Sequence, residues 1–244
     1  MAASTGAGSR TEVVQRAGHG RRTRRLLLWA GIAAVVVYAA GDLVSGLLYD
    51  GYSFRDQAIS ELSAYGSPVR PLAVTWIGVH NLLGIAFAVG IWQSAAGNRA
   101  LRWTAGFSLA AGVVTAPLHP VFPMSSRGME PGVNDTMHPV LTMVFGVCVV
   151  GAVAASAVAF HGWFRFYAIV SLAVIVVFAG LTGPLISDVA DSLPTPWLGA
   201  FERVNAYATF AWMVVLALVL LRGTKTEPPG GVALGPHGVG KTRA

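Results

Sequence analysis

The sequence predicts an all-α protein, in which six transmembrane helices form a bundle. Hydrophobic residues make up 54% of the 244 residues and charged residues only 11%, whereas about a quarter of an ordinary soluble protein is charged. The mean hydropathy is +0.60, and several apolar runs approach the ~20 residues that cross ~30 Å of hydrocarbon. The six predicted spans cover residues 26–48, 71–94, 103–122, 138–160, 166–187 and 204–221.

Each of these runs is continuously apolar and does not alternate with a period of two, so helices are expected and β-barrel strands are not. A helix also satisfies every backbone hydrogen-bonding group within one segment, as lipid requires. Residues 1–25 are rich in Gly, Ser, Thr and Arg and are predicted to form a disordered basic arm. Residues 222–244 contain many glycines and are predicted to form a flexible tail.

The basic residues indicate the orientation of the bundle. Of the 17 Lys and Arg residues, 13 lie in the N-terminal arm, the turns at 98–102 and 161–165, and the tail. Nine of the eleven acidic residues lie on or near the opposite side. Because Lys and Arg concentrate in cytoplasmic segments, we expect a multi-pass protein of the cell membrane with both termini in the cytoplasm. The longer connections, at about 49–70, 123–137 and 188–203, then face outward.

Two features that could indicate nucleic acid or nucleotide have simpler explanations. The net charge of +6 comes from basic residues at the ends of apolar runs, so the lipid bilayer is the expected partner and nucleic acid is not. Residues Gly235–Thr242 match the phosphate-loop pattern G-x-x-x-x-G-K-T. Such a loop binds phosphate by opening a helix, and only two residues follow Thr242, so no nucleotide binding is expected.

Three residues at the outward ends of the predicted helices are candidate catalytic residues and metal ligands. Asp135 and His138 are three residues apart at a helix start, a spacing that can direct both side chains the same way. Glu202 lies at the mouth of the sixth span. A zinc ion held by these residues, or the carboxylate–histidine pair alone, could activate water.

Each candidate also has a structural interpretation. Asp135 or Thr136 could cap the fourth span by accepting hydrogen bonds from its free amides. Glu202 could join Arg203 in an interfacial ion pair with neighbouring loops. Unpaired charges near hydrocarbon are costly, so we expect the three outward connections to converge. The residues expected to meet are Ser60 and Glu61, Asp135 and His138, and Glu202 and Arg203.

Two further histidines lie within or near the spans. His80 falls near the middle of the second span, where an interhelical hydrogen bond is the favoured role. A haem group needs two histidines at similar depth on facing helices, and only His119 and His138 approach that arrangement. They lie too near the surface for a buried macrocycle, so haem is not expected.

The outward connections carry three motifs. They are Tyr52-Ser53 with residues 57–64 (QAISELSA) and 66–68 (GSP), residues 122–124 (FPM) with Arg127-Gly128 and residues 135–138 (DTMH), and residues 193–199 (LPTPWLG) with Glu202-Arg203. In this order they resemble the bacterial multi-pass membrane family catalogued as domain of unknown function 998, over about residues 26–221. The resemblance implies shared polar residues at the outer mouth. Members often have histidine after the Pro-Met pair, where this chain has Ser125, which weakens a three-ligand metal site.

Two classes of function remain open because the resemblance implies no established activity. The favoured class is a non-catalytic membrane protein, such as a small transporter, sensor or assembly factor. The alternative is a membrane-embedded hydrolase or transferase that acts on lipid-type substrates at the outer leaflet through Asp135, His138 and Glu202. Bound metal that depends on His138 would favour the alternative.

Overall fold

The computed structural model describes residues 5–130 and 132–223, and over these residues the protein is all-α. Its helices are α1 (Thr5–Leu48), α2 (Arg70–Ser94), α3 (Arg99–Thr115), α4 (Leu118–Val121), α5 (Val133–Ala159), α6 (Trp163–Thr182), α7 (Leu185–Ala190) and α8 (Leu198–Gly223), with a 3-10 helix η1 (Ile59–Ser63). The described residues form no strand, and one isolated β-bridge joins Tyr65 to Ser125.

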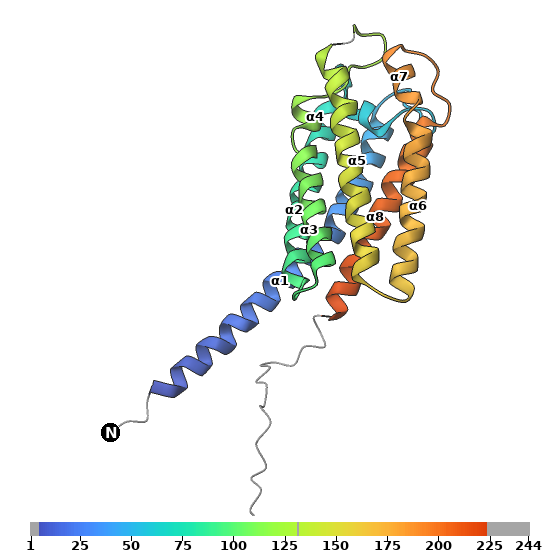
Figure 1. The fold of residues 1–244 in the computed structure, drawn as a ribbon. Coiled ribbons are helices and arrows are strands. Elements are labelled where there is room, and N and C mark those ends of the chain that lie inside the picture. Colours follow the sequence, from blue (N-terminus) through green and yellow to red (C-terminus); the bar gives the residue numbers. More distant parts are fainter. Residues whose placement is uncertain (1–4, 131, 224–244) are drawn as a thin grey trace, which may run out of the picture.

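The long helices lie side by side in a closed bundle (Figure 1). Packing follows the order α1, α2, α3, α5, α6, α8, and α8 packs in turn against α1. Large apolar side chains on these helices are exposed, among them Leu82, Met143 and Phe166 at 69%, 69% and 71%. Exposed apolar surface on this scale is unusual for a soluble monomer, and it is the surface that lipid would cover.

Five of the helices are long and apolar enough to cross a membrane, namely α1 from Gly18 onward, α2, α5, α6 and α8. The prediction of six such spans is corrected at 103–122, where α3 ends at Thr115 after 17 residues and α4 follows as a separate turn. Pro117 and Pro120 cause the break, because each lacks the amide hydrogen that would continue the helical hydrogen-bond ladder. A similar break divides the predicted span 166–187 into α6 and α7, at Gly183-Pro184.

The N-terminal arm also differs from the prediction, because residues 5–25 belong to the continuous helix α1. Nucleation is the costly step of helix formation, and each further residue adds one backbone hydrogen bond. The apolar part of α1 therefore supports helix beyond the predicted span. Residues 1–4 and 224–244, which include the phosphate-loop pattern at Gly235–Thr242, lie outside the described residues.

The three longer connections between helices gather at one end of the bundle (Figure 1). We call residues 49–69, 116–130 and 183–197 together the loop cap. The turns at 95–98 and 160–162, the extended start of α1 and the last turn of α8 lie at the opposite end. Residues far apart in the sequence are thereby brought together in the loop cap.

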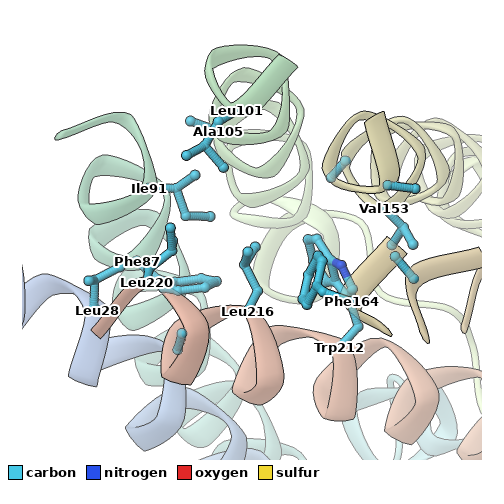
Figure 2. Close-up of a cluster of buried hydrophobic side chains, with 14 of the residues drawn as sticks. Leu28, Phe87, Ile91, Leu101, Ala105, Val153, Phe164, Trp212, Leu216 and Leu220 are labelled. Carbon is cyan, nitrogen blue, oxygen red and sulfur yellow. The ribbon is translucent and has the colours of Figure 1, made fainter. Parts of the chain in front are cut away.

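The bundle is packed mainly by apolar side chains, and Figure 2 shows a cluster of them. Many of its residues, such as Ile91, Leu101, Ala157 and Phe164, lie near the turns at 95–98 and 160–162, toward the end opposite the loop cap. The buried residues labelled in the figure come from α1, α2, α3, α5, α6 and α8, and include Leu28, Phe87, Val153 and Leu216. Trp212 also lies in this cluster, where its indole Nε1 donates to Ser156 Oγ at 3.0 Å. The buried charged groups instead lie at the other end, close to the loop cap.

Candidate functional site

An ion pair between Arg127 and Glu61 connects all three parts of the loop cap. Arg127 Nε donates to Glu61 Oε2 at 2.8 Å, and Nη2 donates to Oε1 at 3.0 Å. The same guanidinium donates from Nη2 to Thr195 Oγ1 at 2.7 Å and from Nη1 to the Leu193 carbonyl at 2.8 Å. Bidentate contacts of this kind are strong and also fix the relative orientation of the two groups. One side chain therefore holds the three connections in fixed positions relative to one another.

Glu61 is only 4% exposed, and both of its carboxylate oxygens are engaged. Besides Arg127, they accept from the Ala58 amide at 2.8 Å and from Gln57 Nε2 at 3.3 Å. The bond from Ala58 satisfies a free amide at the start of η1, in the manner of a helix cap. The hydrogen bonds to Glu61 raise the pKa of Arg127 above its usual value.

A second ion pair joins the first and last helices of the bundle just below the loop cap. Arg203 Nη2 lies 2.7 Å from Asp42 Oδ1, and Nε donates to Oδ2 at 3.1 Å. The two side chains are 13% and 3% exposed. Tyr207 donates its hydroxyl to Asp42 Oδ2 at 3.0 Å, and Arg203 Nη2 donates to the Tyr52 hydroxyl at 2.8 Å. Both oxygens of Asp42 are therefore occupied.

The same arginine fixes the first connection of the loop cap to the start of α8. Arg203 Nη1 donates to the Phe54 carbonyl at 2.9 Å and to the Gln57 carbonyl at 3.3 Å. Gly199 lies against these two carbonyls, and a Cβ atom at this position would collide with both oxygens. The approach of α8 to the cap therefore requires a residue without a side chain.

Asp135 has a capping role in the structure but is not the N-cap itself, because Gly132 is the N-cap of α5 and Asp135, three residues later, bonds back to it. Its Oδ2 accepts from the Gly132 amide at 2.8 Å and from Ser125 Oγ at 2.8 Å, while Oδ1 accepts from the Ser125 amide at 2.6 Å. The backbone on either side of Ser125 bonds to Tyr65 of the first connection. Asp135 thus ties the second connection to α5.

His138 lies one turn after Asp135, and its ring contacts the ring of His119. Its Nδ1 contacts the Phe122 carbonyl at 2.8 Å, and its ring lies 5.5 Å from the ring of His119, centre to centre. The Nδ1 atom of His119 lies 2.7 Å from Ser63 Oγ. Burial lowers the pKa of His119 to about 3, so this imidazole is neutral near pH 7.

The structure does not gather the three predicted metal ligands. Glu202 accepts a hydrogen bond from the Ile59 amide, whereas Asp135 and His138 bond to the second connection. Among the residues that the structure describes, no three His, Cys, Asp or Glu side chains are placed to hold a metal ion together. The catalytic and metal roles of Asp135, His138 and Glu202 remain predictions.

The three outward motifs contact one another, but through pairs of residues that the sequence did not identify as partners. The Ser60–Glu61 segment contacts Glu202 through the neighbouring Ile59 and contacts Arg127 directly. The Ser60 carbonyl accepts from Ser63 Oγ at 3.0 Å. Polar residues inside apolar spans were the available signal for Asp42 and Tyr207. Tyr52, Ser63 and Thr195 lie within the quoted motifs, but nothing in the sequence indicates which residues they contact.

The loop cap also has an open depression of about 430 Å³. Its lining residues are Ser53, Arg55, Asp56, Gln57, Arg127, Pro194, Thr195 and Pro196. The Arg55 guanidinium lies over the Trp197 ring at 5.3 Å and donates to Asp56, which lowers the pKa of that carboxyl to about 2. The depression is therefore lined by charged side chains, and the exposed Trp197 ring lies next to one of them, Arg55.

The apolar helices and the polar loop cap define this chain as a helical membrane protein. The chain matches the family model "Protein of unknown function (DUF998)" over residues 32–219. It belongs to this family, which confirms the resemblance noted in its loop motifs. No curated protein and no solved structure matches the chain.

Proposed function

We propose that the chain crosses the cell membrane six times, with the loop cap outside and both termini in the cytoplasm. The closed ring of helices supports this number, since α3 packs between α2 and α5 as the other helices pack against their neighbours. Its 17 residues rise about 26 Å, close to the thickness of the hydrocarbon core. The starts of α3 and α6 and the last turn of α8, which contain Arg99, Arg102, Arg165 and Arg222, lie at the end opposite the cap, as expected for the cytoplasmic side.

Within this topology, the loop cap serves recognition and not catalysis, in the manner of a sensor or assembly factor. The observation that carries this proposal is that Glu61, Asp135 and Asp42 each have both carboxylate oxygens engaged by protein groups. A general base needs a lone pair within reach of its substrate. The acidic groups instead fix a rigid surface, and the open depression lies in that surface.

The alternative function, a hydrolase or transferase for lipid-type substrates, is favoured by one feature of Glu202. One of its carboxylate oxygens accepts from Ile59, and the other has no hydrogen-bond partner among the described residues. Glu202 thus retains an unused oxygen, unlike Glu61, Asp135 and Asp42. In this alternative Glu202 would be the general base, with His138 and Asp135 as the other candidate catalytic residues.

An assay on the full-length protein separates the two functions. The protein is reconstituted into vesicles and incubated with phospholipids and with lipid-linked diphosphates, and products are measured against protein-free vesicles. We expect no product above that background from the wild type or from Glu202→Gln. Turnover that Glu202→Gln abolishes, at an unchanged unfolding temperature, would overturn the non-catalytic assignment.

A further inference from the structure

Two histidines that lie 19 positions apart in the sequence meet at the edge of the loop cap. Each begins a His-Pro-Val sequence, at 119–121 in α4 and at 138–140 in the first turns of α5. Their ring centres are 5.5 Å apart, and the ring planes make an angle of 77°. His138 is buried, and His119 is partly buried.

The hydrogen bonds of both rings define which nitrogen carries the proton. The Phe122 carbonyl can only accept, so His138 Nδ1 at 2.8 Å carries a hydrogen. Ser63 Oγ donates to the Ser60 carbonyl at 3.0 Å, so it accepts from His119 Nδ1 at 2.7 Å. In their neutral forms, both imidazoles therefore have a lone pair on Nε2.

Neither Nε2 atom has a hydrogen-bond partner among the described residues, because the contacts of both rings are made through Nδ1 and through the ring pair itself. Neither atom is sealed from its surroundings either, since the buried side-chain nitrogens without a partner do not include them. Two lone pairs without a protein partner thus lie in an otherwise packed part of the cap, on atoms that are not completely covered. A ring held through Nδ1 with Nε2 exposed is the usual state of a metal-binding histidine, in which the second nitrogen donates to a carbonyl or similar group.

The ring separation suits one ion between the two imidazoles. A bond of 2.0–2.1 Å from a metal to nitrogen places the ring centre about 3.2 Å from the ion. Two such rings are then about 5 Å apart at a tetrahedral angle and about 6 Å apart in a linear arrangement. The observed 5.5 Å lies between these values.

We propose that His119 and His138 form a two-histidine site for a transition-metal ion of the zinc and copper class, which imidazole nitrogen suits. The two Nε2 atoms are the protein ligands, and the remaining coordination positions are open to water or to a donor on an incoming molecule. Asp135 and Glu202 take no part in this site, because no third His, Cys, Asp or Glu side chain among the described residues is placed to share an ion with the two histidines. The site does not depend on whether the protein is catalytic.

Metal binding by the full-length protein in detergent tests the site, with an affinity tag that contains no histidine. Zn²⁺, and Cu⁺ under reducing conditions, are titrated by calorimetry, and bound metal is measured after dialysis. We expect about one equivalent of at least one of the two ions and a metal-dependent rise in unfolding temperature. Absence of saturable binding of both ions would overturn the site.

The variants His119→Asn and His138→Asn make the test specific. The amide of asparagine can replace the Nδ1 hydrogen bond to Ser63 or to Phe122 but offers no group at the Nε2 position. Each variant should unfold near the wild-type temperature without metal and bind the ion at least tenfold more weakly. The controls are His161→Gln, which lies in a turn at the other end of the bundle, and Glu202→Gln. Wild-type affinity in both Asn variants contradicts the proposal, and loss in Glu202→Gln with retention in His119→Asn would restore the three-ligand site predicted from sequence.

Discussion

The Arg203–Asp42 pair shows how a single residue joins the first and last helices of the bundle. Arg203 contributes hydrogen bonds to Asp42, to Tyr52 and to the backbone of the first cap connection. Taking both charges out of water is costly, and the attraction between them offsets that cost only while both are present. Loss of one partner therefore leaves a charge that the bundle cannot solvate.

We expect Arg203→Gln or Asp42→Asn alone to lower the free energy of unfolding by about 3–5 kcal/mol. The double variant should regain part of that loss, because neither side then carries an unpaired charge. Thermal unfolding in detergent measures all three. Arg55→Gln is the matched control, since Arg55 is exposed in its pair with Asp56, and it should leave the unfolding temperature almost unchanged. Additive losses in the double variant would show that the two charges do not stabilise each other.

Sequence reasoning at this scale identified the charged residues but not their partners. Arg203 was expected to pair with its neighbour Glu202, and its actual partner lies 161 positions earlier. Arg127 and Glu61 both lie in the loop motifs, but the sequence did not predict that they contact each other, because 66 residues separate them. Partner choice depends on how the helices are arranged in space, and a single sequence contains no direct signal of that arrangement.

At the scale of elements, the start of α8 is pressed against the first connection of the loop cap. Gly199 allows this contact, because the carbonyl oxygens of Gln57 and Phe54 occupy the space of a Cβ atom. The backbone cannot yield without disturbing the hydrogen bonds from Arg203 to the same carbonyls. The position of α8 is therefore set by backbone contact.

We expect Gly199→Ala to destabilise the protein by about 1–3 kcal/mol, or more if the Arg203 contacts are lost. Gly78→Ala in α2 is the control, because nothing lies within 4 Å of its added Cβ. That change should be neutral or slightly stabilising, since alanine is the better helix former. Unfolding temperatures of the two variants in the same detergent provide the comparison. Equal effects would mean that the cap can move away from α8.

The positions of the long helices could be predicted from apolar runs, and their ends less well. The predicted spans 71–94 and 138–160 agree closely with α2 and with most of α5. The prolines at 117 and 120 divided a run that hydropathy alone treats as continuous. Helix also continued N-terminally in α1, where composition indicated coil, because a packed helix extends at little cost. Hydropathy measures the preference of side chains for lipid, and it does not register that proline lacks the amide hydrogen needed to continue a helix.

At the scale of the whole molecule, the arrangement of connections makes the proposed topology testable. A reporter that is active only outside the cytoplasm should be inactive when fused to the C-terminus and active when inserted at Glu130 of the loop cap. Glu130 is exposed, so the insertion should not disturb the bundle. Strong activity of the C-terminal fusion would indicate an odd number of crossings or the opposite orientation.

The contact between α1 and α8 has a consequence for how the protein is made. Asp42 enters the membrane with the first helix, and Arg203 is synthesised 161 residues later, which corresponds to about 8–30 s at ordinary rates of translation. During that interval the carboxylate has no guanidinium beside it, and the nascent chain contains an open ring of helices. Completion of the last helix closes the ring of helices and places Arg203 beside Asp42 of the first helix. A chain that stops before α8 would therefore have Asp42 without its arginine partner and would lack the helix that closes the ring.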